Sequence, residues 1–429
     1  MIDKCLVERF HRAFTAQRWN DHIRPVELTV QGKHAHMMTI AWVLGRYQED
    51  RGSRLDWMYL IEGGMFELLR RCVTFDLKSQ VFDYLVQDDA RAAKLNKIVV
   101  KELNDEIECV GGGFSDRMAA YFSTANGDRP PAQELAYGVL RAASSLATAW
   151  EFRVIEQSNA FLAETDNIRT NLEQSRRWHQ YLPGFREIER GETDLARFVD
   201  LCGRLRFQTR WSHTPIIPSC NVLEHELMVA NLAYLLALER GRLSRARYND
   251  YFGGLFHDFL EVLTRDIVAP FKHKLASAGL DKHIDAYAEK ELRKQVGRML
   301  PKAWFDEIRF LCTSEFEDRQ WPGPQRPPAD DSAEGDPAED NLDGSLVKCA
   351  DNFAAFTEAY FSIDYGVTSR DLRNAIEHIY DDRKRYGDSF DGIYLEWYRE
   401  IEATLRKKQP PQSNNGETAV RVATPDDPK

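Results

Sequence analysis

The chain has 429 residues, of which 57 are Lys or Arg and 68 are Asp or Glu, so its formal net charge is −11 with histidine neutral. Hydrophobic residues make up 43% of the sequence and aromatic residues 11%, which supplies a packed core and excludes a disordered or fibrous chain. The acidic balance argues against stable nucleic-acid binding, because that affinity comes from clustered Lys and Arg that neutralise phosphates.

The seven cysteines are scattered and form no CxxC pair, which is typical of reduced thiols in a cytoplasmic protein. The N-terminal residues carry charges where a secretory signal needs an apolar run. Apolar stretches such as 228–238 fall well short of the roughly 20 residues that span a bilayer. We therefore expect a cytoplasmic protein with no membrane partner.

Apolar residues recur every three or four positions over most of the chain, which predicts an all-α fold. Five segments of the first part recur later in the same order. Arg18-Trp19 recurs at 210–211, residues 35–41 at 224–230, 63–66 at 253–256, 74–76 at 264–266 and 140–144 at 347–351. The first four pairs keep an offset of 189 to 192 positions and the last is displaced to 207. We therefore predict two tandem helical domains, at 1–180 (the first half) and 195–406 (the second half).

The clearest single helix is predicted over 223–241. Asn221, with Glu224 three residues later, resembles a capping box, and Gly241 supplies the stop.

Two other segments depart from the helical pattern. Residues 321–344 carry five Pro and seven Asp or Glu, and 407–429 are rich in Pro, Asn and Thr, so we predict a disordered insert and a disordered tail.

The second half contains His225, then the adjacent pair His257-Asp258, predicted to lie on a helix, and then Asp351 on a later helix. Two imidazoles and two carboxylates suit a divalent metal ion, and four protein ligands around a six-coordinate ion leave places for water and a phosphate oxygen. Such an ion can activate water for hydrolysis. Glu261 would share a helical face with His257 and Asp258, where it can orient that water or carry its proton.

This ordered set resembles the H…HD…D signature of the HD-domain metal-dependent phosphohydrolases. The strings at 221–225, 257–272 and 345–351 look like the YfbR-type 5′-deoxynucleotidases in particular, and the upstream Arg210-Trp211 pair fits as well. The resemblance covers roughly residues 200–375. It implies a helical bundle around one divalent ion that hydrolyses deoxyribonucleoside 5′-monophosphates to nucleoside and phosphate.

The resemblance also implies a role for each matching residue. The metal, whose identity among Mn, Co, Mg, Fe and Zn stays open, would be held by His225, His257, Asp258 and Asp351. Among the substrate contacts, Arg210 would meet the phosphate, and Trp211 would press on the sugar where a 2′-hydroxyl would otherwise sit. Asp266 would hydrogen-bond the 3′-hydroxyl and act with Glu261 as a catalytic residue, and Glu261 would position the attacking water.

The first half departs from this signature. Aligned on the repeats, His36 is the counterpart of one ligand, but the other three positions and that of the catalytic glutamate hold different residues: Glu67, Leu68, Ser144 and Arg71. Leucine and serine cannot replace the two carboxylates, so we expect no metal here and interpret this half as a degenerate HD-type domain. Arg18, Trp19 and Asp76 persist, which leaves a vestigial nucleotide pocket open.

The sequence therefore predicts an all-α protein with two tandem HD-type domains, the second catalytically complete, acting on a nucleotide substrate. Two alternatives remain. A dNTP triphosphohydrolase would use the same ligands but needs more basic side chains, and few stand near the motifs. A non-catalytic nucleotide-sensing or scaffold protein would have no reason to keep the full ligand set with Glu261. The resemblance also allows a homo-oligomer.

Overall fold

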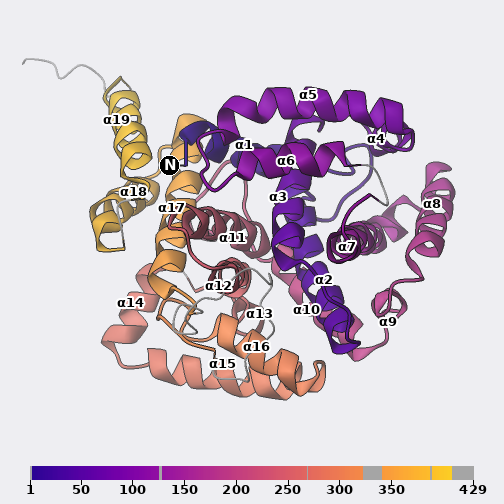
Figure 1. Cartoon of the computed structure of the whole chain (residues 1–429). Coiled ribbons are helices and arrows are strands. Elements are labelled where there is room, and N and C mark those ends of the chain that lie inside the picture. Colours follow the sequence, from indigo (N-terminus) through magenta and orange to yellow (C-terminus); the bar gives the residue numbers. More distant parts are fainter. Residues whose placement is uncertain (1, 125–127, 268, 322–340, 387–388, 408–429) are drawn as a thin grey trace, which may run out of the picture.

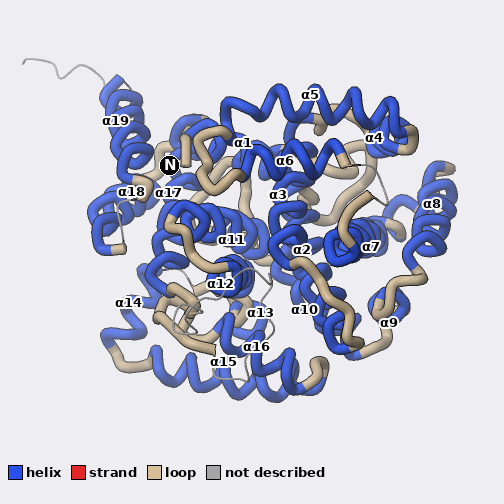
Figure 2. Tube along the Cα trace, viewed as in Figure 1, coloured by secondary structure: helices blue, strands red, loops and turns tan. Residues whose placement is uncertain are grey.

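The computed structural model describes residues 2–124, 128–267, 269–321, 341–386 and 389–407. These residues form helices without any β-strand, apart from three isolated bridges, which confirms the all-α prediction (Figure 2). The helices up to residue 189 are α1 (Lys4–Thr15), α2 (Val30–Asp50), α3 (Trp57–Val73), α4 (Ser79–Val86), α5 (Asp89–Ile107), α6 (Phe114–Ser123), α7 (Pro131–Ile155), α8 (Glu164–His179) and α9 (Phe185–Glu189). The later helices are α10 (Asp194–Gly203), α11 (Val222–Glu239), α12 (Ser244–Phe256), α13 (Glu261–Thr264), α14 (Ala269–Ser277), α15 (Asp281–Gln295), α16 (Lys302–Cys312), α17 (Gly344–Asp364), α18 (Arg370–Asp382) and α19 (Asp391–Lys407).

Helices α2 and α11 pack against each other at the centre of the molecule (Figure 1). Both are buried around almost their whole circumference, as expected of helices that neighbours cover on every side. On one side α2 contacts α3 and α7, and on the other α11 contacts α12 and α17. Across the boundary, the indole nitrogen of Trp42 donates to the Tyr248 hydroxyl at 3.0 Å. The two halves therefore share one continuous hydrophobic core.

The start of α11 confirms the predicted capping box. The Asn221 side chain accepts from the backbone of Glu224, and the Glu224 carboxylate accepts in return from the backbone of Asn221, each at 3.0 Å. The N-cap of α2 is Thr29, whose hydroxyl accepts from the backbone of Gly32 and donates to the Glu224 carboxylate. The first turns of the two central helices are therefore hydrogen-bonded to each other as well as capped.

The repeated Arg-Trp segments adopt the same local conformation. Trp19 and Trp211 have φ values of 54° and 56°, in the left-handed region that few non-glycine residues enter. Each segment also forms one antiparallel bridge to the N-cap of the following central helix, Gln17 to Thr29 and Thr209 to Asn221. Each residue of the first segment lies 192 positions before its counterpart, namely Gln17 before Thr209, Trp19 before Trp211 and Thr29 before Asn221.

The offset of 192 corrects the alignment of the first half. Counted from its N-cap, Lys33 of α2 stands where His225 stands in α11, so His36 is not the counterpart of His225. The His36 ring lies edge-on to Trp150, and its Nε2 is 3.0 Å from the carbonyl oxygen of Val199. The sequence alignment was wrong here because the similar letters around the two histidines lie three positions out of helical register.

The predicted disordered segments fall mostly on residues 322–340 and 408–429, which lie outside the described residues. The end of the predicted insert is, however, part of the fold. Leu342 is fully buried, and Asp343 is the N-cap of α17, where its carboxylate accepts from the backbone of Leu346 at 2.8 Å. Composition missed this helix start because Asp followed by Gly also marks turns and loops.

Two further features concern the cysteines and the length of the helices. None of the seven cysteines forms a disulfide. Within the described residues, every helix is too short or too polar to cross a lipid bilayer.

Gly254 of α12 is expected to tolerate no side chain. A Cβ atom placed there would lie 2.8 Å from Cα and 2.9 Å from N of Ala230 in α11, and this backbone cannot rotate away. We expect Gly254→Ala to lower the free energy of unfolding by about 1–3 kcal/mol, measured by thermal and urea unfolding. Gly392→Ala, at a helical glycine whose Cβ would have nothing within 4 Å, is the control and should raise stability. Equal effects of the two substitutions would contradict this close packing.

Candidate metal centre

The four predicted metal ligands come together in the fold. His225 lies in the first turns of α11, His257 and Asp258 directly follow α12, and Asp351 lies in α17. Nε2 of His225 is 2.9 Å from Oδ1 of Asp351, and Nε2 of His257 is 3.2 Å from Oδ2 of Asp258 and 3.9 Å from Oδ1 of Asp351. The donor atoms of His225, His257 and Asp258 all lie within 4.8 Å of one another.

His257 and Asp258 are not inside a continuous helix, which corrects the predicted local structure. Helix α12 ends at Phe256 and α13 begins at Glu261, with a turn between them. In this turn the backbone hydrogen bonds span three residues rather than four, as from Phe259 to Phe256 and from Glu261 to Asp258. This tighter turn interrupts the helical register after His257. His257 and Glu261 therefore do not share the face of one helix, as the sequence had predicted.

Both imidazoles are oriented by a hydrogen bond on the side away from the site. Nδ1 of His225 is 2.7 Å from Oε1 of Glu358, and Nδ1 of His257 is 2.7 Å from the carbonyl oxygen of Gly254. With the proton on Nδ1, each neutral imidazole would offer its Nε2 lone pair to a metal ion. Nε2 of His257 is buried without a hydrogen-bond partner. This donor set of two imidazoles and two carboxylates fits a divalent first-row metal ion or Mg.

The two carboxylates of the site stay ionised. Burial raises the pKa of Asp258, but His257 and Arg210 outweigh it and hold that pKa well below its usual range. Burial also acts against Asp351, where Lys348, at 2.7 Å from Oδ2, and His225 lower the pKa more strongly. Anionic carboxylates are the form that binds metal, so these neighbours keep the ligands ready for a cation.

Arg210 and Trp211 lie at the edge of this cluster. Nη1 of Arg210 is 3.3 Å from Oδ2 of Asp258, and its Nε is 3.5 Å from Oε2 of Glu358. The indole nitrogen of Trp211 donates to the same Glu358 oxygen at 2.7 Å. The predicted phosphate contact therefore lies beside a predicted metal ligand, and one buried carboxylate holds the arginine, the tryptophan and His225 together.

Glu358 is the residue that sequence reasoning missed. Its counterpart is Glu151, which lies 207 positions earlier, the same offset that separates Ser144 from Asp351. In the first half Glu151 accepts from Nε of Arg18 and from the indole of Trp19, both at 2.8 Å. Continuing the repeat comparison by two helical turns would have revealed the pair.

The predicted catalytic acids, Glu261 and Asp266, follow Asp258 in the chain. Glu261 is buried; its Oε1 is 3.6 Å from Nζ of Lys272, and its Oε2 has no hydrogen-bond partner. Burial and the charges of Asp258 and Asp266 raise the pKa of Glu261 well above its ordinary value. Asp266 is half-buried, and its backbone N–H donates to the side chain of Gln208 at 3.3 Å.

We expect Glu358→Gln to weaken metal binding by about 10- to 100-fold, because the variant loses the charge that orients and polarises His225. The affinity for Mn or Co, measured by calorimetry on the full chain, checks this. Glu151→Gln makes the same change in the first half and should leave the metal affinity unaltered. An unchanged affinity in Glu358→Gln would mean that His225 is not held in place by this carboxylate.

Comparison with known proteins agrees with the geometry. Residues 202–380 match the HD domain family. A 5′-deoxynucleotidase of Vibrio atlanticus is 32% identical over 117 residues, which covers 26% of this chain and 58% of the relative. A 5′-deoxynucleotidase of Vibrio vulnificus is 32% identical over 132 residues, covering 28% and 62%, and one of Yersinia pestis is 29% identical over 126 residues with the same coverage.

The chain thus spans about three fifths of the length of these curated relatives. No solved structure matches it. The family match begins at α10 and ends within α18, so it contains His225, His257, Asp258 and Asp351. Residues 202–380 of this chain are therefore similar to the HD domain family.

Proposed function

We propose that the protein is a metal-dependent phosphohydrolase that converts deoxyribonucleoside 5′-monophosphates to deoxynucleosides and phosphate. The observation that carries this proposal is the convergence of four donor groups from α11, the turn after α12, and α17, with both Nε2 atoms directed at the two carboxylates. The relatives named 5′-deoxynucleotidase support the choice of substrate class.

His225, His257, Asp258 and Asp351 would hold the ion. When bound, a divalent ion supplies charge neutralisation for a phosphoryl group and lowers the pKa of water. The protein contributes a rigid frame, because hydrogen bonds to Glu358 and to Gly254 keep both imidazoles from turning. A fixed donor set costs little reorganisation when the substrate arrives.

Arg210 and Trp211 would orient the substrate. The Arg210 guanidinium is already within 3.5 Å of Asp258 and Glu358, so it is held beside the ion site with donors left for a phosphate. Trp211 is fixed by Glu358 next to it and presents an aromatic face to the sugar. Asp266 follows the turn that carries Glu261 and is the proposed partner of the 3′-hydroxyl.

Glu261 is the proposed proton carrier. It is buried near Asp258, and burial together with the charges of Asp258 and Asp266 raises its pKa, which favours its protonated form. Its proposed task is to position the attacking water and pass a proton toward the departing deoxynucleoside oxygen.

The triphosphohydrolase alternative is less well supported by the charges around the site. Of the nearby lysines, Lys348 contacts Asp351 at 2.7 Å and Lys272 contacts Glu261 at 3.6 Å. Together with Arg210, these are few cations for a triphosphate, which favours a substrate with a single phosphate. The products distinguish the two reactions, since one releases inorganic phosphate and the other releases triphosphate.

The test is a panel in which the purified full chain is incubated with each dNMP, rNMP and dNTP, with Mn, Co, Mg, Fe or Zn added after EDTA treatment. We expect metal-dependent phosphate release from dNMPs and much slower release from rNMPs. No release from any substrate with any metal would leave the non-catalytic alternative standing.

We also propose that the chain is a tandem duplication in which the first half is a degenerate HD-type domain. Three local features support this: the positive φ of Trp19 and Trp211, the paired bridges to the N-caps, and the carboxylates Glu151 and Glu358 under each tryptophan. Residues 1–180 and 195–406 remain the proposed limits.

A further inference from the structure

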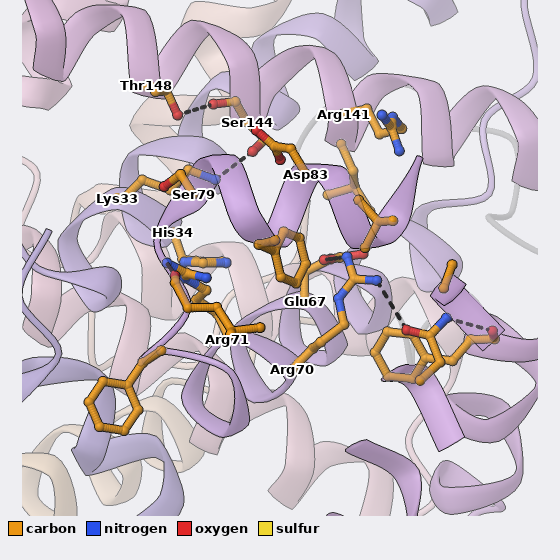
Figure 3. A pocket seen from close by; sticks show the side chains of 18 of the residues that line it. Lys33, His34, Glu67, Arg70, Arg71, Ser79, Asp83, Arg141, Ser144 and Thr148 are labelled. Carbon is orange, nitrogen blue, oxygen red and sulfur yellow. Dashed lines mark hydrogen bonds and ion pairs between the residues drawn. The ribbon is translucent and has the colours of Figure 1, made fainter. Parts of the chain in front are cut away.

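The first half contains a cavity of about 1600 Å³ between α2, α3, α4, α5 and α7 (Figure 3). It lies where the second half has its cluster of metal ligands, because Lys33, Glu67 and Ser144, the counterparts of His225, His257 and Asp351, all line it. Arg18, Trp19 and Asp76 line it too. A cavity at this position is large enough for a nucleotide.

Lys33 replaces a metal ligand by a cation. Its ammonium group donates to the Ser144 hydroxyl, just as His225 contacts Asp351 in the other half (Figure 3). The Lys33 side chain is buried, and its other polar contact is the thioether of Met37 at 3.7 Å. In the first half the Lys33 ammonium therefore supplies a positive charge at the position where the second half would bind an ion.

The positive groups in this cavity are short of negative partners. Nine Lys and Arg line it against six Asp and Glu. Within the described residues, no carboxylate lies within 4.0 Å of the cationic groups of Lys33, Arg71 or Arg141, although other groups in the cavity do form ion pairs. Arg71 donates to the backbone carbonyl oxygens of Leu77 and Thr74. Of these three, Lys33 is buried and Arg71 half-buried, so an unpaired charge is most costly at Lys33, and an anionic ligand would relieve that cost.

The pKa of Lys33 agrees with this lack of partners. Burial lowers it to about 7, and the nearby charge of Arg18 acts in the same direction. Burial likewise lowers the pKa of the Arg71 guanidinium to about 10, with Arg18 again contributing. The positive charge of Arg18 thus acts on both Lys33 and Arg71, although Arg18 itself is paired with Glu151.

We propose that this cavity is a metal-free binding site for a nucleoside phosphate, in which the Lys33 ammonium and the guanidinium groups of Arg18 and Arg71 hold the phosphate. Leu68 and Ser144 stand where the second half has Asp258 and Asp351, so the site binds the ligand without hydrolysing it.

The phosphate part of the proposal rests on the cations of the cavity alone. The nucleoside part rests on the proposed function, because it transfers the substrate class of Arg210 and Trp211 to Arg18 and Trp19. The geometry supports that transfer, since each tryptophan has the same positive φ and donates to a buried glutamate at 2.7 to 2.8 Å.

The test is calorimetric titration of the full chain in EDTA with dAMP, dCMP, dGMP and dTMP, and with inorganic phosphate and deoxyadenosine as separate arms. EDTA removes the ion on which the second site depends. We expect at least one mononucleotide to bind at one equivalent per chain, more tightly than phosphate or deoxyadenosine. Asp258→Ala should bind it unchanged.

Two substitutions of opposite sign make the test specific. Lys33→Met, which keeps the volume of the buried chain, should weaken binding by about 10- to 100-fold through loss of a charge-assisted contact. Asp83 lines the cavity and interacts electrostatically with Arg141, Arg71 and Lys33, so Asp83→Asn should tighten binding. Lys302→Met, at an exposed lysine of α16, is the control and should change nothing.

No mononucleotide binding in EDTA, or binding that Lys33→Met leaves intact, overturns the proposal. Phosphate that binds as tightly as every nucleotide overturns the nucleoside part. Both results are separate from the fate of the proposed function, which depends on metal-dependent phosphate release. The chain can pass either test and fail the other.

Discussion

Asp258→Ala is expected to abolish metal-dependent phosphate release, with a loss of at least about 1000-fold. Asp258 contributes a half-buried, ionised oxygen 3.2 Å from Nε2 of His257 and also anchors Arg210, so its removal weakens both the proposed ion site and the phosphate contact. Losing several kcal/mol of transition-state stabilisation corresponds to such a factor, since each 1.36 kcal/mol is tenfold in rate. The measurement is the initial rate with the best metal and dNMP of the panel.

Asp306→Ala is the matched control for this loss. Asp306 pairs with Lys302 on the surface of α16, so the same substitution there should leave the rate unaltered. Circular dichroism and thermal unfolding in EDTA should show that Asp258→Ala is still folded. A folded Asp258→Ala protein that retains the wild-type rate would remove the proposed reaction centre.

Glu151→Gln is expected to produce the largest loss of stability among these variants. Glu151 is fully buried; its Oε2 accepts from Arg18 and Trp19, and its Oε1 accepts from Arg206 at 2.7 Å. The side chain of Arg206 is also buried, at 1% exposure, so it would lose its buried counter-charge. Breaking a buried ion pair from one side costs about 3–5 kcal/mol, which urea unfolding at pH 7 should show.

The same variant should reveal a dependence on pH. Burial raises the pKa of Glu151, but Arg18 and Arg206 together outweigh it and lower the pKa from 4.5 to about 2. A depressed folded-state pKa adds stability above pH 4.5 that is lost as the pH falls toward 2, an amount of about 3 kcal/mol. Wild type and Glu151→Gln should therefore converge in stability in this window. A gap of constant size across it would show that Glu151 is not ionised in the native protein.

The ligands of the candidate metal centre could be predicted from the sequence because each is a specific residue type in a specific order. His225, His257, Asp258 and Asp351 are spread over more than 120 positions, yet their residue types and order indicate a metal site without any knowledge of the fold. The capping box at Asn221 was equally legible, since it depends on residues only three positions apart. Helix caps and ordered motifs can therefore be recognised from the sequence alone.

Other parts of the site could not be predicted because they depend on contacts between distant helices. The sequence shows Glu358 only as the repeat partner of Glu151; its contacts with Trp211 and His225 depend on where α17 packs. Similar residues around His36 and His225 led to an alignment in which Lys33 had no role. The positions of the two N-caps corrected this alignment and paired Lys33 with His225. The turn after His257 was also invisible, because residues 257–264 carry a helical pattern throughout.

The sequence by itself predicted that this chain is helical, and it placed in the second half four residues that resemble an HD-type ligand set, because hydrophobic period and residue chemistry are properties of the chain. Only the tertiary structure decided that the two halves share one core through α2 and α11. It also decided that Lys33 contacts Ser144 in the first half, at the position where His225 contacts Asp351 in the second. The physical reason is that packing and burial depend on which side chains meet across the interior, and that information is not contained in any single segment.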